Sequence, residues 1–374
     1  MSCCISFNKF DLKYLLYCIL FLFVQLYFHL FIYSDVTDKN IVIKHKLLDP
    51  SFLFLGLLLN IIPEWISNIR SSSTNPINLS ILDIIKLFFI CLFLLITQFS
   101  RIIPPIVNKN RNKDEYEDYF NIFEFLVIYL VPHSSEVYYI HQKFSFLIFT
   151  LIEIVKILVF LIDKTFDNFF AIFTEIFISI YYAFFFIYTK GLMKYKFISP
   201  YKCNFLVGTI NFPLIIIIYL IISFTSFGNK NYEYYIDNIK EIFNTKLGVI
   251  NAIRLLSLPF AYGIYGSVLN NIFYDYTLYH SYLPLFVQNF IKDIFNLIEN
   301  GTILKTIFII SCFFIELIMI LVFLEIIELN FCGLNKNLKK NIEFRALNET
   351  SLEIKDYFDD ETNNQRDTIN NKKN

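Results

Sequence analysis

The stretch TILKTIFIISCFFIELIMILVFLEIIEL, residues 302–329, decides the fold class. Isoleucine, leucine and phenylalanine dominate it, and only four of its residues are charged. A helix of about 20 mostly apolar residues crosses the hydrocarbon core of a bilayer, because its backbone polar groups pair with one another inside the helix. The stretch therefore predicts a transmembrane helix.

The rest of the chain has the same character. Of its 374 residues, 56% are hydrophobic and 17% are charged, whereas a soluble domain has about 25% charged residues. An aqueous core could not bury so many apolar runs, so the lipid bilayer is the predicted surrounding. The net charge of −1 provides no basic field and argues against nucleic acid as a partner.

Ten segments are candidates for membrane spans. Eight are long and apolar, and they occupy residues 14–33, 47–66, 84–99, 146–162, 169–189, 204–227, 247–269 and 302–329. Two are weaker: segment 120–131 contains Glu124 and runs into Pro132, and segment 283–298 begins beside Pro284. Counting both gives about ten spans, and rejecting both gives eight. We expect an all-α, polytopic bundle of transmembrane helices.

The spans divide into two halves of similar length. The short hydrophilic loop 163–168 separates residues 14–162, with spans one to five, from residues 169–329, with spans six to ten. An odd number of spans in each half inverts the second half relative to the first, as in many transporters. We therefore predict a 5+5 inverted repeat, in which the two weak spans are the fourth of each half.

The flanking segments bear on the orientation in the membrane. An even number of spans puts both termini on one side, but Lys and Arg are equally frequent on the two sides. Two lysine-rich loops, at 190–202 and 336–340, lack neighbouring acidic residues and favour a cytosolic N-terminus at residues 1–13. The Asn-rich segment 346–374 has too little apolar surface to fold, so we expect a disordered polar tail.

Two motifs resemble those of a known group. KGLMKYKFISPYKC at 190–203 and EIIELNFCGLNKNLKKNI at 325–342, which includes ELNFCGLNKN, are similar to signatures of an uncharacterised group of protist and fungal multispanning membrane proteins. That group is related to the drug/metabolite transporter superfamily, which includes the nucleotide-sugar and triose-phosphate transporters, and the five-plus-five layout resembles this superfamily. The chain lacks the paired lysines and the Gly-rich motif of nucleotide-sugar transporters, which argues against that substrate class.

Glu175 in span six is the best-placed candidate for a substrate pathway. At about 100° per residue it shares one helix face with Ser179, Tyr182 and Thr189. An ionisable side chain at bilayer depth needs a partner or a wet cavity. One interpretation is a cavity wall with a protonatable or substrate-binding carboxylate, and the other is hydrogen bonding that holds neighbouring helices together.

Arg254 in span eight is the second candidate. It shares a face with Asn251, Ser257, Ala261 and Tyr265. A guanidinium suits a carboxylate or a phosphate because its donors form a planar fork. The alternative is a structural ion pair, for which Glu175 is an available partner.

The weak spans and the fifth and tenth spans hold the remaining charged candidates. Short, interrupted segments at matching positions point to a binding region, so the other pathway candidates are Glu124, Gln288, Asn289 and Lys292. In the superfamily the fifth and tenth helices are peripheral, and the resemblance implies packing or homodimer contacts there. We expect structural roles for Glu153 and Lys156, which can pair, and for Glu316.

Other chemistry is sparse. The seven cysteines and five histidines lack metal-ligand spacing, so no metal, no cofactor and no enzymatic activity are predicted. The leading hypothesis is a secondary transporter that moves a small organic solute across an endomembrane (Golgi, ER or vacuole) or the plasma membrane. The alternative is a multispanning scaffold or assembly factor without transport.

Overall fold

The account of the fold rests on a computed structural model. It describes residues 5–7, 11–28, 48–71, 79–107, 121–131, 139–163, 169–224, 248–287 and 303–330, with a few single positions besides. At some helical positions it describes only the backbone. Gln288, Asn289 and Lys292 lie outside the described residues, as do most of residues 1–13 and the tail 346–374.

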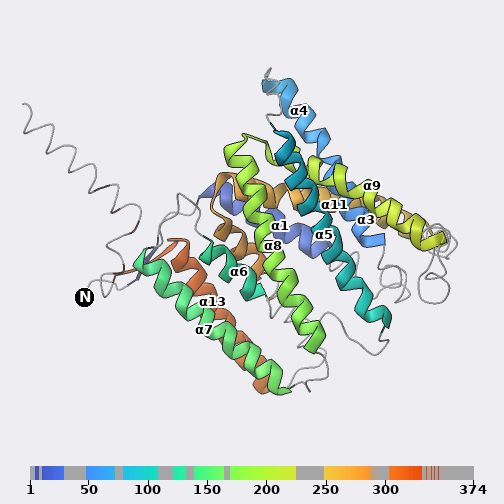
Figure 1. Cartoon of the computed structure of the whole chain (residues 1–374). Coiled ribbons are helices and arrows are strands. Elements are labelled where there is room, and N and C mark those ends of the chain that lie inside the picture. The colour runs from blue at the N-terminus through green and yellow to red at the C-terminus, as the bar shows by residue number, and fades with distance from the viewer. Residues whose placement is uncertain are drawn as a thin grey trace, which may run out of the picture. The chain divides into compact units, whose positions relative to one another are not determined.

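The described residues are predominantly helical, as the apolar runs predict (Figure 1). Several helices are long and apolar enough to cross a membrane, in agreement with an integral membrane protein, and by length and composition they occupy Pro50–Ile69, Ile176–Tyr195, Pro200–Ile218 and Thr306–Phe323. The helices are α1 (Leu12–Tyr27), α3 (Leu48–Leu59), α4 (Ile61–Ser71), α5 (Ile81–Val107), α6 (Asn121–Leu130), α7 (Ile140–Asp163), α8 (Phe169–Tyr195), α9 (Pro200–Phe224), α11 (Gly248–Asp275) and α13 (Ile303–Phe323), with the 3₁₀ turn η5 (Leu278–Ser281).

The last predicted span ends earlier than expected, and this corrects an entirely helical reading of 302–329. Helix α13 stops at Phe323, and Glu325 takes a left-handed φ of 60°. The N–H of Ile326 then bonds to the carbonyl of Leu321, and that of Glu325 to Val322, which is the Schellman way to end a helix. Beyond it, β2 (Ile327–Leu329) pairs antiparallel with β1 (Ile5–Phe7).

The chain divides into two compact units, which we describe separately. Unit 1 comprises residues 1–9, 135–151 and 314–374. In it, the first half of α7 packs on the last part of α13: the Gln142 amide donates to the Phe323 carbonyl over 3.5 Å, and the Ser145 hydroxyl donates to the Met319 carbonyl. An apolar cluster lies beneath the β1–β2 pair, and it contains Val322, Ile327, Leu329 and Leu334 with Phe144 and Leu321 at its edge.

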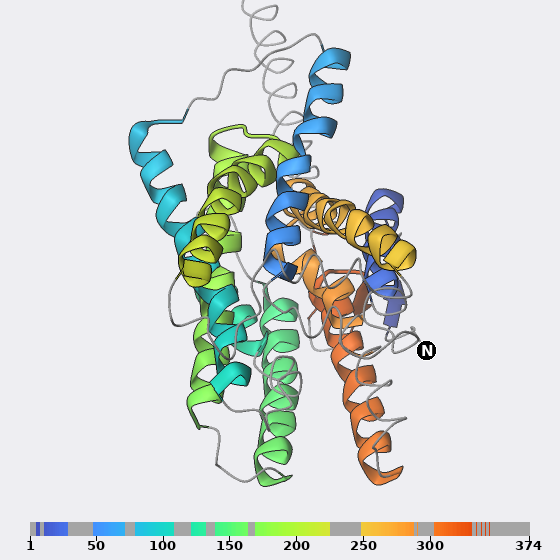
Figure 2. The ribbon, with the colours of Figure 1, turned by 90° about the vertical axis from the view of Figure 1, so that its right-hand side faces the viewer.

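Unit 2 comprises residues 10–134 and 152–313 and holds most of the helices. Helix α11 packs against α3, α1 and α9, and α3 also packs against α9. Helix α5 lies beside α8 (Figure 2), and α6 packs on α8 as well.

Large apolar side chains cover the outer faces of these helices. On α5, for example, Leu87, Cys91, Leu94 and Leu95 are buried, while the opposite face exposes Ile85, Phe88, Phe89, Phe93 and Ile96. Exposed apolar surface on this scale is unfavourable in water and normal in lipid. The exposed faces are therefore the surface that we expect hydrocarbon to cover.

Candidate functional site

The weak predicted segment 120–131 contacts, in unit 2, the residues that come just before the other weak segment, 283–298. The hydroxyl of Tyr282, in the helical residues 282–287, donates to Oε1 of Glu124 on α6 over 3.2 Å. The hydroxyl of Tyr279 in η5 donates to the Ile128 carbonyl over 3.0 Å. Tyr279 and Tyr282 lie outside the predicted segments, and their contact with α6 is a finding of the structure. We call this contact the Glu124 junction.

Aromatic side chains pack against one another at the Glu124 junction. Phe125 contacts the rings of Tyr279 and Tyr282 edge to face, at centroid distances of 5.6 Å and 4.6 Å. Glu124 itself is only 8% exposed. Burial of a carboxyl group at bilayer depth is unfavourable, and such groups in membrane proteins bind protons, cations or substrate groups. The junction can therefore hold a proton or receive a cationic group.

The predicted polar face of α8 points inward where it is described. Ser179 and Thr189 are both buried, and the Thr189 hydroxyl donates to the carbonyls of Phe185 and Phe186 over 3.0 Å and 3.1 Å. Tyr182 stacks on the ring of Phe186. The side chain of Glu175 lies outside the described residues, so its role stays a prediction.

The predicted face of α11 packs on α1 where it is described. The hydroxyls of Ser257 and Tyr27 share a hydrogen bond, and Ala261 joins an apolar cluster with Val24 and Phe28. The ring of Tyr265 lies 5.1 Å from that of Phe21. Helix α1 therefore covers this part of the face. The side chains of Arg254 and Asn251 lie outside the described residues.

The charged residues of the fifth and tenth spans are buried. Lys156 Nζ lies 2.8 Å from Glu153 Oε1, which is the ion pair that their spacing predicts. Glu316 on α13 is almost completely buried. Both observations suit a structural role better than a substrate contact, because the charges of Glu153 and Lys156 are satisfied within one helix.

A second polar region, which the sequence did not single out, joins α3, α9 and α11. The Asn60 amide donates to the carbonyls of Gly56 (3.2 Å) and Gly263 (3.3 Å) and accepts from Ser267. The Asn270 amide donates to Asn204 Oδ1 over 2.6 Å. We call this region the asparagine seam. The signal for it was present, since four-residue spacing of Gly263 and Ser267 predicts close helix approach, but the partner helix was unknown.

Glycines bring the backbones of the asparagine seam together. A Cβ atom added at Gly56 would lie 2.3 Å from the Pro259 carbonyl, and one added at Gly208 would lie 2.4 Å from the Leu58 nitrogen. Gly263 has a similar approach to the Gly56 carbonyl, at 2.8 Å. These distances leave no room for a side chain, so glycine is required at these positions.

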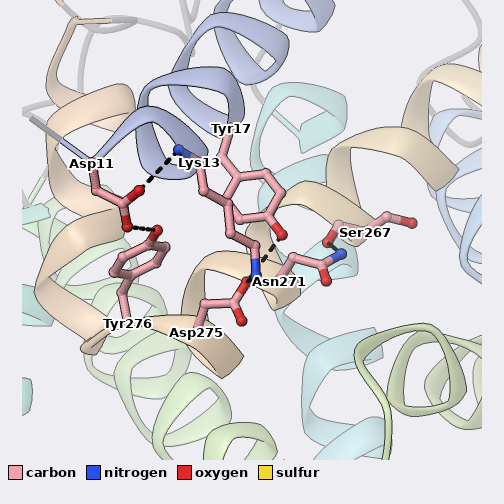
Figure 3. A network of polar contacts seen from close by, with 7 residues as sticks. All are labelled: Asp11, Lys13, Tyr17, Ser267, Asn271, Asp275 and Tyr276. Atoms are coloured by element: carbon pink, nitrogen blue, oxygen red, sulfur yellow. Dashed lines mark hydrogen bonds and ion pairs between the residues drawn. The ribbon is translucent and has the colours of Figure 1, made fainter.

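A third polar network joins the start of α1 to the end of α11 (Figure 3). Lys13 Nζ lies 2.8 Å from Asp275 Oδ2, and the Tyr17 hydroxyl donates to the same oxygen over 3.0 Å. Asp11 caps α1 by accepting from the Lys13 N–H over 2.9 Å, and it also accepts from the Tyr276 hydroxyl. These hydrogen bonds, led by that of Tyr276, lower the pKa of the Asp11 carboxyl below its ordinary value.

The lysine-rich segment 190–202 has an acidic partner that is distant in the sequence. Lys196 Nζ lies 2.9 Å from Asp83 Oδ2 at the start of α5, and the Ser80 hydroxyl donates to the same carboxylate over 2.7 Å. The hydrogen bond from Lys196 is the largest cause that lowers the pKa of Asp83 to about 2. The ion pair links α5 to the end of α8, and the cytosolic placement of the termini stays a prediction.

Comparison with known proteins does not assign the chain to a family. No protein-family model matches the chain, and no curated protein matches it. The resemblance of residues 190–203 and 325–342 to a transporter-related group therefore stays a prediction. Within the described part of the chain, no group of three His, Cys, Asp or Glu side chains is placed to hold a metal ion.

Proposed function

We propose that this chain is a multi-pass membrane transporter that moves a small organic solute by alternating access. The observation that carries the proposal is the Glu124 junction, where two short apolar segments meet around a buried carboxyl group. Intramembrane carboxyl groups are unfavourable, and in transporters they bind substrates or relay protons. The resemblance to the drug/metabolite transporter superfamily is a second, independent support.

Glu124 is the proposed coupling residue. In the protonated state the carboxyl group is neutral and suits its buried position. On release of the proton, the carboxylate accepts from the Tyr282 hydroxyl and attracts a cationic group or another proton. If the solute binds only the protonated or only the deprotonated protein, solute binding is coupled to proton binding. Alternating access driven by a proton gradient requires this coupling.

The network at the start of α1 is the proposed closed end of the pathway. It joins helices distant in sequence through exposed ion pairs and hydrogen bonds, which are individually weak. The Lys190 ammonium adds a link from α8 by donating to the Tyr276 carbonyl over 3.2 Å. Contacts of this kind can open and re-form at little expense in free energy, whereas the asparagine seam is too closely packed to do so.

Solute uptake by purified protein in liposomes tests the proposal. Radiolabelled amino acids, sugars, nucleosides and organic acids are offered with and without an inward proton gradient. We expect one class of solute to accumulate in the liposomes and the proton gradient to increase its accumulation. Glu124→Gln should abolish the uptake that the gradient drives. Tyr282→Phe should reduce it. Glu64→Gln is the control, since Glu64 is a half-buried acid on α4 that accepts from Ser199. Uptake that is equal in wild type, Glu124→Gln and empty liposomes contradicts the proposal.

The second candidate function is a scaffold or assembly factor without transport. The observation that favours it is the covering of the Ser257, Ala261 and Tyr265 face of α11 by α1, which resembles a packed interior. This function predicts no uptake of any solute and a partner that binds the polar tail 346–374. Co-purification of a partner from the native membrane by the full chain, but not by a chain that ends at residue 345, would support it.

A further inference from the structure

One amide in the asparagine seam has no partner of its own. Asn211 on α9 is 0% exposed, and neither Nδ2 nor Oδ1 has a hydrogen-bond partner among the described residues. Two other buried polar atoms in the same helix pair share this condition, Ser51 Oγ on α3 and Asn204 Nδ2 on α9. In folded proteins the great majority of buried polar groups form hydrogen bonds. A buried polar group without a partner usually marks a bound water molecule or ligand.

The helix register places the three atoms along one interface. Ser199, before α9, donates to Glu64 on α4, and Gly208 abuts Leu58 on α3, so α9 and α3 run in opposite directions (Figure 2). Asn204, Gly208 and Asn211 share one face of α9 by their spacing. Asn211 therefore lies one turn beyond the Gly208 contact, toward the end of α3 that carries Ser51.

The chemistry of this interface selects a neutral ligand. From Ser51 onward α3 contains no charged residue, and neither does α9 from Cys203 onward; their charged residues, Asp49 and Lys202, lie at the N-terminal ends of the two helices. A neutral ligand therefore suits the interior of this interface. The free atoms require both roles: Asn211 Oδ1 accepts, Nδ2 donates, and Ser51 Oγ does either. A hydroxyl group or a water molecule both donates and accepts and meets these requirements.

We propose that a hydroxyl group, from water or from a small neutral solute, binds between α3 and α9 at Asn211 and Ser51. The site is separate from the Glu124 junction and does not depend on transport. With the hydroxyl bound, the Asn211 amide is hydrogen-bonded, so the side chain stabilises the fold. Without it, the same amide is an unpaired polar group in an apolar interior and destabilises the fold.

The Asn211 side chain thus stabilises the fold if the hydroxyl group is bound and destabilises it if not, so the stability of variants tests the proposal directly. The thermal unfolding midpoint is measured in lipid nanodiscs for wild type, Asn211→Leu and Ser51→Ala. Thr209→Leu is the matched control, because Thr209 is an exposed polar residue on α9 that bonds only within its helix, to the Phe205 carbonyl over 2.7 Å. We expect Asn211→Leu to lower the midpoint by several degrees, Ser51→Ala to lower it less, and Thr209→Leu to leave it unchanged or higher.

Two further readouts distinguish the source of the hydroxyl. If water is bound, radiolytic labelling of wild type without any solute oxidises Phe54, which is fully buried and lies next to Asn211 by the same register. If a solute is bound, added glycerol raises the midpoint of wild type more than that of Asn211→Leu, and Phe54 stays unlabelled without glycerol. A midpoint for Asn211→Leu at or above that of wild type overturns the proposal. Should that variant fail to fold, an unlabelled Phe54 together with an unchanged Ser51→Ala midpoint overturns it.

Discussion

The asparagine seam and the Glu124 junction both bury polar side chains, but they bury different ones. The seam holds neutral amides between helices that glycines bring into backbone contact. The junction holds a carboxyl group between short segments spaced by aromatic rings. A neutral amide both donates and accepts without any change of charge, whereas a carboxyl group changes its charge with its surroundings.

This difference teaches which region suits packing and which suits function. A close-packed interface has few alternative arrangements, because any shift of one helix meets the backbone of the next. A junction of short segments and aromatic side chains has fewer contacts between helix backbones. Its carboxyl group has two protonation states. We therefore assign stability to the seam and coupling to the junction, and the variants below separate the two roles.

The largest expected effect comes from adding one methyl group to the seam. Gly56→Ala would place a Cβ 2.3 Å from the Pro259 carbonyl, so one helix must move. We expect a loss of about 3 kcal/mol or more in stability, since overpacking against backbone has no flexible side chain to relieve it. Thermal unfolding followed with a thiol-reactive dye measures it, because Cys91 and Cys203 are buried in the folded protein.

Gly191→Ala is the matched control for this variant. Gly191 also lies in a helix, but the nearest atom to its added Cβ is Tyr195 Cδ2 at 4.0 Å. We expect no loss and a gain of up to about 1 kcal/mol, because alanine favours the helix more than glycine does. Equal midpoints for the two alanine variants would show that α3 and α11 do not approach as closely as the structure indicates.

The junction should respond less in stability and more in activity. Tyr282→Phe removes the donor to Glu124 and leaves the buried carboxyl group with one bond fewer. We expect a loss of about 1–3 kcal/mol in stability. Tyr279→Phe is the companion variant, since it removes a bond to the Ile128 carbonyl and not to the acid. A Tyr282→Phe protein as stable as wild type would remove the hydroxyl from the account of the junction.

Asn270→Leu should have a smaller effect within the seam. It removes the donor to Asn204 Oδ1, and hydrogen bonds between membrane helices contribute about 0.5–2 kcal/mol. Asn271→Leu is the comparison, because the Asn271 amide bonds to the Ser267 carbonyl within its own helix. Unfolding midpoints of the two variants check the prediction. A larger loss for Asn271→Leu than for Asn270→Leu would contradict the role of the inter-helix bond.

The smallest effect concerns the exposed ends of the helices and depends on pH. The pKa of Asp83 is lowered to about 2, so the stabilising contribution of its carboxylate is present above its unfolded pKa, near 4. It is lost as the pH falls from about 4 toward 2. Unfolding midpoints of wild type and Asp83→Asn should therefore differ at pH 6 and converge at low pH. A difference that grows on acidification would contradict this assignment.

The sequence predicts the helices better than their partners. The run 302–329 predicts the last helix, but its end at Phe323 depends on the left-handed Glu325, which no apolar run reveals. Glu124 was found because an acid in a short apolar segment is unfavourable in lipid. Its partner Tyr282 was missed, since an aromatic residue near a span is common. Asp11 and Tyr276 are 265 residues apart, and only the tertiary fold brings them together.

The central claim is that hydrocarbon covers the exposed apolar faces of this chain. Hydroxyl-radical footprinting of the wild-type protein in lipid nanodiscs tests it with residues of one type. Phe89 on α5, Phe314 on α13 and Phe197 in the α8–α9 connection are 53%, 56% and 84% exposed, respectively. We predict strong oxidation of Phe197 and almost none of Phe89 and Phe314, because lipid excludes the radical source from the latter two. Oxidation of all three phenylalanines in proportion to their exposure would place these faces in water and contradict the account.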